Sequence, residues 1–226
     1  MDGYLLVDKP LGISSFGVVA RVRRIISDAK GKKVKIGHCG TLDPAASGLM
    51  ILVIGKYTKK ASEFSKLDKT YIAEITLGLE SSTGDREGEL TRINDKIPSI
   101  QEVQAVLDGF VGEISQVPPA FSAVKVDGQR AYKLARQGRE VKIEPRKVTI
   151  YKLQTTNYEY PKLCFTARVS SGTYVRSLAK DIGQKLGTGA YVSALRRTKV
   201  GDFDIKDALI FEKLNISELE TEVVKE

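Results

Sequence analysis

Residues 37–50 read GHCGTLDPAASGLM and gather several reactive side-chain types in one short segment. They include the chain's single histidine, one of its two cysteines, an aspartate and three glycines. Pro44 restricts the backbone directly after Asp43, and glycines allow tight turns or close approach to another molecule. Asp43 is therefore expected on a stiff loop, where a carboxylate suits chemistry. The alternative is that Asp43 only shapes the turn before the proline, and residue types alone leave both interpretations open.

Three other side chains could take part in such a site. His38 could be a general base or a ligand, but it could equally stack on a nucleobase or bind a backbone group. Tyr71 belongs to the alternating segment TYIAEITL, so it is either a core residue of a strand or a site residue. Arg176 is expected in the first turn of a helix, where a cation opposes the helix dipole. A specific carboxylate or phosphate partner would explain an arginine at that position.

Several common kinds of site are missing from the sequence. It has no Walker-type phosphate loop and no GxGxxG after a strand, so neither ATP nor a dinucleotide is indicated. A Ser-His-Asp triad could use only His38, and no serine has a nucleophile-elbow context. Cys39, Cys164 and His38 supply at most three metal ligands, so we expect neither a metal nor another cofactor.

The chain carries a net charge of +8 with a pI near 9.3, which favours a polyanionic partner such as nucleic acid over simple solubility charge. The excess positive charge is concentrated in two clusters. The first basic cluster comprises Arg21, Arg23, Arg24, Lys30, Lys32, Lys33 and Lys35. The second basic cluster, residues 125–147, has eight Lys or Arg residues against three acidic ones and includes Lys125 and Arg130. Such a stretch could follow a phosphate backbone.

The elements that must position these residues are both strands and helices. Strands are expected at residues 3–7, 49–55, 70–77, 148–151 and 163–169. Helices are expected after Ser14 or Ser15, after the capping-box pair Ser99 and Glu102, over residues 131–137, and from about residue 175 to Gly187. Asp127 and Gly128 could close a hairpin. Because there is no regular βαβ rhythm, we expect an α+β fold with a largely antiparallel sheet.

The chain shows no internal repeat or linker that would divide it, and its length of 226 residues allows a sizeable core. Residues 211–226 turn acidic, and their end is expected to be frayed. The N-terminus lacks the layout of a signal peptide, and no apolar run reaches about 18 residues. We therefore expect a cytoplasmic protein that does not interact with a membrane.

Seven motifs in one order resemble the TruB family of tRNA pseudouridine synthases. The resemblance runs from about residue 3 to about residue 210. A single motif would be a weak signal, but seven motifs in the same order argue against chance similarity. The motifs are DKPLGISS at 8–15, GHCGTLDPAASGLM at 37–50, KTYIAEITLG at 69–78, TGDREG at 83–88, VPPAFSAVK at 117–125, SGTYVRSLAKDIG at 171–183 and ALRRTKVGDF at 194–203.

This resemblance implies isomerisation of uridine 55 in the T loop of tRNA, without metal or cofactor. The N1 glycosidic bond breaks, the base rotates, and C5 is joined to C1′. It also implies that Asp43 is the nucleophile and that Arg176 pairs with it. Tyr71 would stack on the flipped base and is a candidate to take the C5 proton late in the reaction. Whether Asp43 attacks C6 of the base or C1′ of the ribose is left open.

Other positions carry implied roles in binding RNA. His38 would fill the space that the flipped nucleotide leaves, and Lys9 would support the active-site loop. Tyr174 and Leu195 would line the uracil pocket, and Asp85 lies in a segment that contacts RNA in the family. A basic mobile element at about residues 123–150, with Lys125 and Arg130, would close over the T arm.

The implied fold is the pseudouridine synthase fold, a mixed, mostly antiparallel sheet flanked by helices with a central catalytic cleft. Residues 1–210 would form the catalytic domain and 211–226 an acidic tail, without the PUA-type domain of many relatives. Tyr191 departs from the histidine that is frequent in relatives. The expected partner is the T stem-loop of tRNA, bound by a monomer without an obligatory protein partner. The alternatives are a guide-RNA-dependent synthase, disfavoured by the missing extensions, and a tRNA-folding chaperone.

Overall fold

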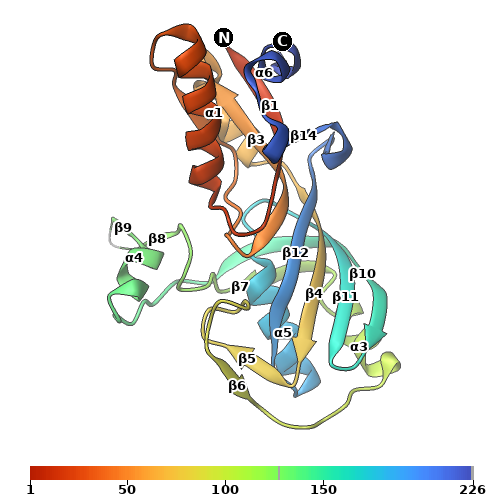
Figure 1. The fold of residues 1–226 in the computed structure, drawn as a ribbon. Helices are drawn as coiled ribbons and strands as arrows, with labels where there is room; N and C mark the ends of the chain where they lie inside the picture. Colours follow the sequence, from red (N-terminus) through yellow and green to blue (C-terminus); the bar gives the residue numbers. More distant parts are fainter. Residues whose placement is uncertain (127, 225–226) are drawn as a thin grey trace. The chain divides into compact units, whose positions relative to one another are not determined.

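A computed structural model describes residues 1–126 and 128–224 of the chain, which divide into two compact units (Figure 1). Unit 1 consists of Met1–Tyr71 and Leu195–Glu226, and unit 2 consists of Ile72–Ala194. Strands β4 (Lys69–Leu77) and β12 (Ala190–Val200) contribute residues to both units. Among the described residues, no helix is long and apolar enough to cross a membrane.

Unit 1 is built on strands in the order β14-β1-β3-β12. Its strands are β1 (Gly3–Lys9), β2 (Ile36–His38), β3 (Ala46–Ile54), β13 (Phe203–Asp204) and β14 (Leu209–Ile210). Its helices are α1 (Ser15–Lys30), α2 (Ala61–Ser65) and α6 (Ile216–Glu222), with 3-10 turns η1 (Gly55–Lys60), η2 (Ile205–Asp207) and η3 (Phe211–Lys213). Strand β3 is antiparallel to β1 and β2 and parallel to β12, and eight of its nine residues are buried. Burial on both faces explains its continuous apolar run.

Helix α1 begins and ends where local chemistry indicates. Ser14 is the N-cap, and its hydroxyl accepts a hydrogen bond from the Gly17 N–H. The apolar residues Val18, Val22 and Ile26 are buried. Gly31 ends the helix in the left-handed conformation. Of the two serines expected as possible caps, Ser14 therefore has this role, which leaves Ser15 with another.

Unit 2 contains strands in the order β12-β4-β11-β10-β7. Its further strands are β5 (Leu79–Ser81), β6 (Leu90–Arg92), β7 (Gly112–Gln116), β8 (Lys125–Val126), β9 (Gln129–Arg130), β10 (Arg146–Glu159) and β11 (Lys162–Val169). Its helices are α3 (Ile100–Asp108), α4 (Ala131–Arg136) and α5 (Val175–Leu186). The expected capping box is present, and α5 has a buried apolar stripe of Val175, Leu178, Ala179, Ile182 and Leu186. Strand β10 pairs antiparallel with both β11 and β7.

The structure bears on two expectations about short segments, the hairpin around residue 127 and the acidic C-terminal segment. Lys125–Val126 and Gln129–Arg130 form an antiparallel pair around the expected hairpin turn, although Asp127 itself lies outside the described residues. The acidic segment is ordered as far as Val224, and the end of the chain, which was expected to be frayed, lies outside the described residues. Asn215 caps α6, Leu219 is fully buried, and Val224 forms an antiparallel bridge with Tyr4. Apolar residues within the acidic segment provide this packing.

Candidate active site

The loop that carries Asp43 in unit 1 is fixed by hydrogen bonds on both sides of that residue. We call residues 39–45, between β2 and β3, the Asp43 loop. The Asp43 carbonyl accepts from the Ala46 N–H at 3.0 Å, and the Pro44 carbonyl accepts from the Gly12 N–H at 2.8 Å. The Cys39 N–H donates to the Ile51 carbonyl at 2.9 Å. Asp43 therefore lies on a loop, as expected, and most of the bonds that hold this loop come from neighbouring segments.

Two residues of the DKPLGISS motif hold this loop from outside. Lys9 is fully buried, and its ammonium donates to the carbonyls of Pro10 at 2.8 Å and Ile13 at 2.6 Å. It thereby shapes the segment whose Gly12 N–H reaches the loop. Ser15 is also buried, and its hydroxyl bonds both the N–H and the carbonyl of Leu42, the residue before Asp43.

Arg197 binds the loop from strand β12, and sequence reasoning missed it. Only 1% of its surface is exposed. Its Nε donates to the Leu49 carbonyl at 2.8 Å and its Nη2 to the Gly40 carbonyl at 3.1 Å. A guanidinium that bonds main-chain carbonyls is fixed in place and partly compensated for the loss of water. The neighbouring Arg196 pairs with Asp8 at 2.6 Å. The signal in the sequence was the motif ALRRTKVGDF, in which the two consecutive arginines were given no role.

Burial changes the titration of two groups near Arg197. Burial, followed by the charge of Arg197, lowers the pKa of Lys69 to about 8. Burial raises the pKa of the Cys39 thiol to about 11, against the opposing effect of Lys69. The Lys69 ammonium donates to the carbonyls of Ser65 at 2.6 Å and Leu67 at 2.5 Å. It therefore holds the turn that leads into β4.

The structure places the remaining predicted site residues of unit 1 on strands. Tyr71 lies on β4 with its side chain mostly buried, as either of its two interpretations requires. His38 ends β2, opposite Leu52 of β3, and is half-buried. Leu195 of β12 is paired in register with Ala46, the residue that begins β3 and closes the turn after Asp43.

In unit 2, Arg176 lies beside a carboxylate, one of the two kinds of partner that its position in the helix predicted. Its Nη1 lies 3.4 Å from Asp85 Oδ2, and both side chains are 7% exposed. Nη1 also donates to the Thr83 carbonyl at 2.9 Å, and Nη2 donates to the Phe121 carbonyl at 2.8 Å. The guanidinium therefore joins two loops to the first turn of α5.

The Asp85 carboxylate is engaged within the protein. Its Oδ1 accepts from the Thr83 hydroxyl at 2.6 Å and from the Glu87 N–H at 3.1 Å. The residue also forms a parallel bridge with Val192. Asp85 thus shapes the TGDREG loop with its side chain while its neighbours Arg86 and Glu87 are exposed.

Tyr174 is the N-cap residue of α5, and its surroundings include a second residue that sequence reasoning missed. Its N–H donates to Gln116 Oε1 at 2.8 Å, and Gln116 is only 1% exposed. The Arg146 guanidinium lies over the Tyr174 ring, 4.9 Å from its centre. The Ser177 hydroxyl donates to the Val117 carbonyl at 2.6 Å. The chain at residues 116–121 therefore holds the first turn of α5 at several points.

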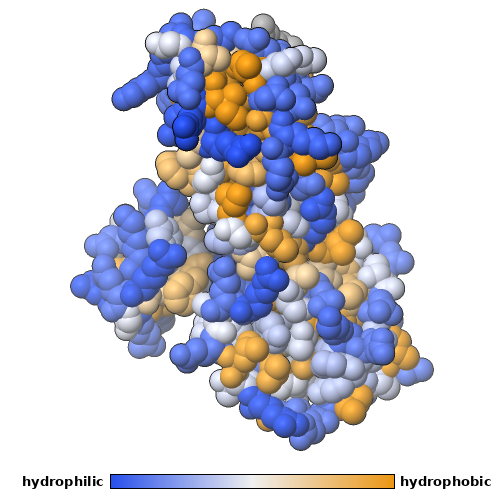
Figure 2. All heavy atoms as spheres, in the orientation of Figure 1, coloured by the Kyte–Doolittle hydropathy of each residue, from blue (hydrophilic) through white to orange (hydrophobic). Residues whose placement is uncertain are grey.

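The second basic cluster presents charge on small elements. Lys125, Arg130, Lys133, Arg136 and Arg139 are all exposed. Arg130 donates to the Ala123 carbonyl at 3.3 Å, and the Arg136 guanidinium lies over the Tyr132 ring. On the face that Figure 2 shows, hydrophilic residues predominate and hydrophobic residues form separate patches. Lys147, at the end of this cluster, pairs with Glu113 at 2.7 Å. The exposed cations of the cluster can contact a polyanion.

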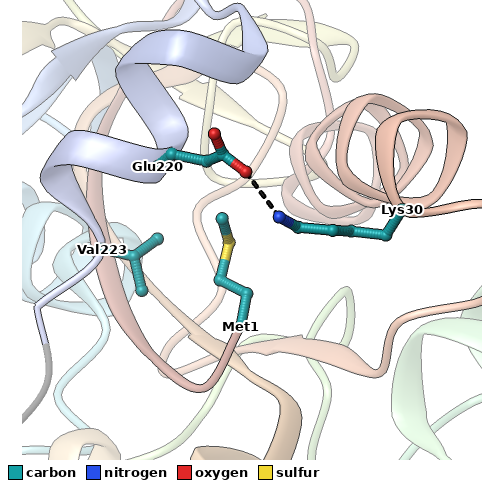
Figure 3. A pocket seen from close by; sticks show the side chains of 4 residues that line it. All are labelled: Met1, Lys30, Glu220 and Val223. Carbon is teal, nitrogen blue, oxygen red and sulfur yellow. Dashed lines mark hydrogen bonds and ion pairs between the residues drawn. The ribbon is translucent and has the colours of Figure 1, made fainter.

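Each unit contains a pocket that described residues line. The pocket of unit 2, about 510 Å³, follows α5 and is lined by residues 81–84 and 117–121, with Arg176 and Lys180 among the charged groups. Burial raises the pKa of Asp181, which also lines it. The pocket of unit 1 lies between the ends of α1 and α6, where Lys30 and Glu220 form an ion pair at 2.5 Å beside Met1 and Val223 (Figure 3). The two charged residues of the unit 1 pocket are therefore already paired with each other.

Two family models match the chain. Residues 23–175 match the model described as TruB family pseudouridylate synthase (N terminal domain). Residues 176–223 match the model described as tRNA pseudouridylate synthase B C-terminal domain. Together the two matches account for most of the sequence, including the Asp43 loop and the Arg176 helix.

Curated relatives are similar over almost the whole chain. A protein of Endomicrobium trichonymphae named tRNA pseudouridine synthase B is 43% identical over 212 residues, which is 93% of this chain and 90% of the relative. A protein of the same name from Opitutus terrae is 43% identical over 228 residues, 99% of this chain and 92% of the relative. One from Dehalococcoides mccartyi is 46% identical over 215 residues, 95% of this chain and 70% of the relative.

Solved structures share the fold. The crystal structure of a Cbf5-Nop10-Gar1 complex contains a chain with a TM-score of 0.72 and 30% identity, covering 94% of this chain and 53% of that one. The structure of an H/ACA RNP bound to a substrate RNA containing 2′-deoxyuridine contains one with a TM-score of 0.69 and 27% identity, covering 94% and 52%.

Proposed function

Because the chain belongs to the TruB family of pseudouridylate synthases, we propose that it converts uridine 55 in the T loop of tRNA to pseudouridine. The relatives named tRNA pseudouridine synthase B support the choice of tRNA as substrate. The single observation that carries the proposal is the Asp43 loop, whose backbone is bonded to three neighbouring segments. A nucleophile held in one geometry loses less entropy when it reaches its target.

The proposed reaction rearranges one nucleotide without adding or removing atoms overall. The bond between N1 and C1′ breaks, and a bond between C5 and C1′ forms. C5 loses a proton to a base, which passes it to solvent, and N1 gains a proton from solvent. Asp43 acts as the nucleophile, at C6 of the base or at C1′ of the ribose, and it must be ionised to do so.

We assign Arg176 as the group that keeps Asp43 ionised during the reaction. This role follows from the resemblance of SGTYVRSLAKDIG to the family motif. A nearby cation favours the charged form of a carboxylate. The bonds of Arg176 to Asp85, Thr83 and Phe121 support the assignment, because they hold its guanidinium in one orientation.

Tyr71 is proposed to stack on the extruded uracil and to take the C5 proton. Extrusion of a base costs a few kcal/mol, and stacking on an aromatic side chain returns about 1 to 3 kcal/mol. The aromatic contact can therefore offset much of the cost of flipping. The mostly buried position of Tyr71 on β4 gives the ring a fixed orientation for this role.

The remaining roles concern RNA binding. Tyr174 and Leu195 line the uracil pocket, and His38 fills the space that the flipped base leaves. Lys9 and Asp85 support the segments that contact RNA, and their buried hydrogen bonds fit that part. Lys125 and Arg130 close over the T arm as part of the mobile element. The proposal places a monomeric enzyme in the cytoplasm, without an obligatory protein partner.

An unmodified T-arm hairpin tests this function directly. Wild-type protein should modify the T-loop uridine in the absence of added metal or cofactor, and carbodiimide labelling with primer extension would map the product. Asp43→Asn keeps the size of the side chain but removes the nucleophilic carboxylate. We expect it to bind the hairpin with unchanged affinity and to lose at least about 10⁴-fold in rate.

Other results would redirect the proposal. Loss of binding together with activity in Asp43→Asn would contradict a purely chemical role for the carboxylate. Binding without modification by the wild type, on both the hairpin and full-length tRNA, would favour the chaperone function. The fold shared with chains of the Cbf5 and H/ACA structures favours a guide-dependent synthase as the second candidate. A strict requirement for a guide RNA and accessory proteins would establish it.

A further inference from the structure

We propose that Ser15 is a positioning residue for the Asp43 carboxylate, an inference that rests on the proposed function. Ser15 is 3% exposed and lies at the first position of α1, 27 residues before Leu42. Its hydroxyl accepts a hydrogen bond from the Leu42 N–H at 2.7 Å and donates one to the Leu42 carbonyl at 2.8 Å. A single side chain therefore binds both main-chain groups of the residue that precedes Asp43.

The orientation of Asp43 depends on those two bonds through the geometry of the peptide. The carbonyl of Leu42 and the N–H and Cα of Asp43 lie in one plane, because the peptide bond does not rotate freely. When Ser15 fixes the direction of the Leu42 carbonyl, it also fixes the plane from which the Asp43 side chain projects. The Leu42 side chain is itself buried, which limits rotation on the other side of the residue.

Ser15 acts on Leu42, directly before Asp43, whereas the other bonds described above act at other positions in the loop. The Ala46 and Gly12 bonds act at the carbonyls of Asp43 and Pro44, on the C-terminal side. Arg197 acts on the Gly40 carbonyl, before Leu42. The hydroxyl of Ser15 therefore provides the restraint immediately before the nucleophile. Without it, two buried main-chain groups would lack partners, and the loop would move to satisfy them.

The adjacent serine provides a matched control. Ser14 and Ser15 have the same side chain, but the Ser14 hydroxyl accepts from the Gly17 N–H of its own helix. Removing the Ser14 hydroxyl should lower the midpoint of thermal unfolding by a few degrees, because a helix cap is lost. It should not change the geometry of Asp43. The two substitutions thus separate an effect on stability from an effect on the position of the nucleophile.

The test measures chemistry and binding separately. A T-arm hairpin labelled with tritium at C5 of its uridine releases tritium when C5 exchanges its hydrogen for C1′. In single turnover with saturating enzyme, Ser15→Ala should react about 10- to 100-fold more slowly than wild type, because small displacements of a catalytic group are costly. Its Kd for the hairpin should be unchanged. Ser15→Thr, which retains a hydroxyl, should restore most of the rate, and Ser14→Ala should react at the wild-type rate.

Several outcomes would overturn the assignment. Equal rates for Ser15→Ala and Ser14→Ala, or a Ser15→Ala defect that appears wholly in Kd, would show that Ser15 does not position Asp43. If Ser15→Ala does not fold, Ser15→Cys replaces it, since a thiol fills similar space but bonds weakly, and the same loss of rate is expected. A wild-type protein that releases no tritium from the hairpin or from full-length tRNA would instead overturn the proposed function, so the two failures are distinguishable.

Discussion

Cations buried around the Asp43 loop bond main-chain carbonyls. Lys9, Lys69 and Arg197 each donate to at least two carbonyl oxygens within unit 1. A buried charge is costly unless hydrogen bonds replace its water, so each cation fixes the backbone segment that it contacts. Two of these segments, around Pro10 and Gly40, belong to or contact the Asp43 loop. The buried cations therefore help to fix the main chain of the candidate site.

At the scale of single residues, Lys69 and Cys39 make stability depend on pH in opposite directions. The pKa of Lys69 is lowered from 10.5 to about 8, so between these values the unfolded chain binds more protons and the free energy of unfolding rises with pH. The pKa of Cys39 is raised from 9.0 to about 11, so between those values the folded protein binds more protons and the free energy of unfolding falls.

Cys39→Ala should therefore leave only the contribution of Lys69, which makes the free energy of unfolding rise with pH. Relative to wild type, the variant should gain free energy of unfolding as the pH rises from 9.0 to 10.5, by at most about 1.4 kcal/mol per pH unit. Urea unfolding at pH 8, 9 and 10.5 would measure the difference. A difference that does not change with pH would show that the Cys39 thiol titrates alike in the folded and unfolded states.

At the scale of elements, the parallel pairing of β3 with β12 determines which glycine of the motif is indispensable. The register aligns Gly48 with Arg197 and Ala46 with Leu195. A Cβ at Gly48 would lie 2.3 Å from the Arg197 carbonyl oxygen and 2.6 Å from its nitrogen, and φ is +115°. Both the close approach and the backbone angle exclude a side chain. The same strand contact places the Arg197 guanidinium against the Asp43 loop.

Gly48→Ala and Gly37→Ala form a matched pair within one motif. A Cβ at Gly37 would lie 3.7 Å from a Val53 methyl group, an ordinary contact. Gly48→Ala should lower the free energy of unfolding by about 2 kcal/mol or more, because the strands must separate to admit the methyl group. Gly37→Ala should change it by less than about 1 kcal/mol. Thermal or chemical unfolding would measure both, and equal effects would contradict the importance of the β3 and β12 contact.

At the scale of the whole molecule, net charge and family membership point to the same partner. The charge of +8 includes two exposed basic clusters, one on and after α1 and one on β8, β9, α4 and the following loop. The pseudouridine synthase fold expected from the resemblance is confirmed, with a mixed and mostly antiparallel sheet flanked by helices. A nucleic-acid substrate accounts for a charge distribution that the fold itself does not require.

The affinity for RNA should therefore depend steeply on salt. Phosphate contacts release counterions, so the Kd for a T-arm hairpin should rise by at least about tenfold between roughly 50 and 200 mM salt. Replacing both Lys133 and Arg139 by Gln should reduce the slope of log Kd against log salt by up to about 2. Lys152→Gln, an exposed lysine of β10, is the control and should leave the slope unchanged. A flat response in the wild type would exclude the basic clusters as the RNA footprint.

The sequence by itself determined the features that depend on neighbouring residues. The capping box of Ser99 and Glu102 and the apolar stripe of α5 both follow from spacing over a few positions. Co-linear motifs indicated the family because each motif keeps its residue types together in the chain. The class of partner for Arg176, a carboxylate or phosphate, was also predictable from its place in the first helical turn.

Only the tertiary structure decided which distant groups hold the site together. Ser15 binds a residue 27 positions away, Gln116 binds one 58 positions away, and Arg197 one 157 positions away. A side chain that bonds a remote carbonyl or N–H leaves no periodic pattern in the sequence. Its main-chain partner cannot be recognised either, because residues of almost every type carry the same main-chain groups. Strand β12 escaped prediction for the same reason, since its polar residues are explained only by the strands and loops that surround them.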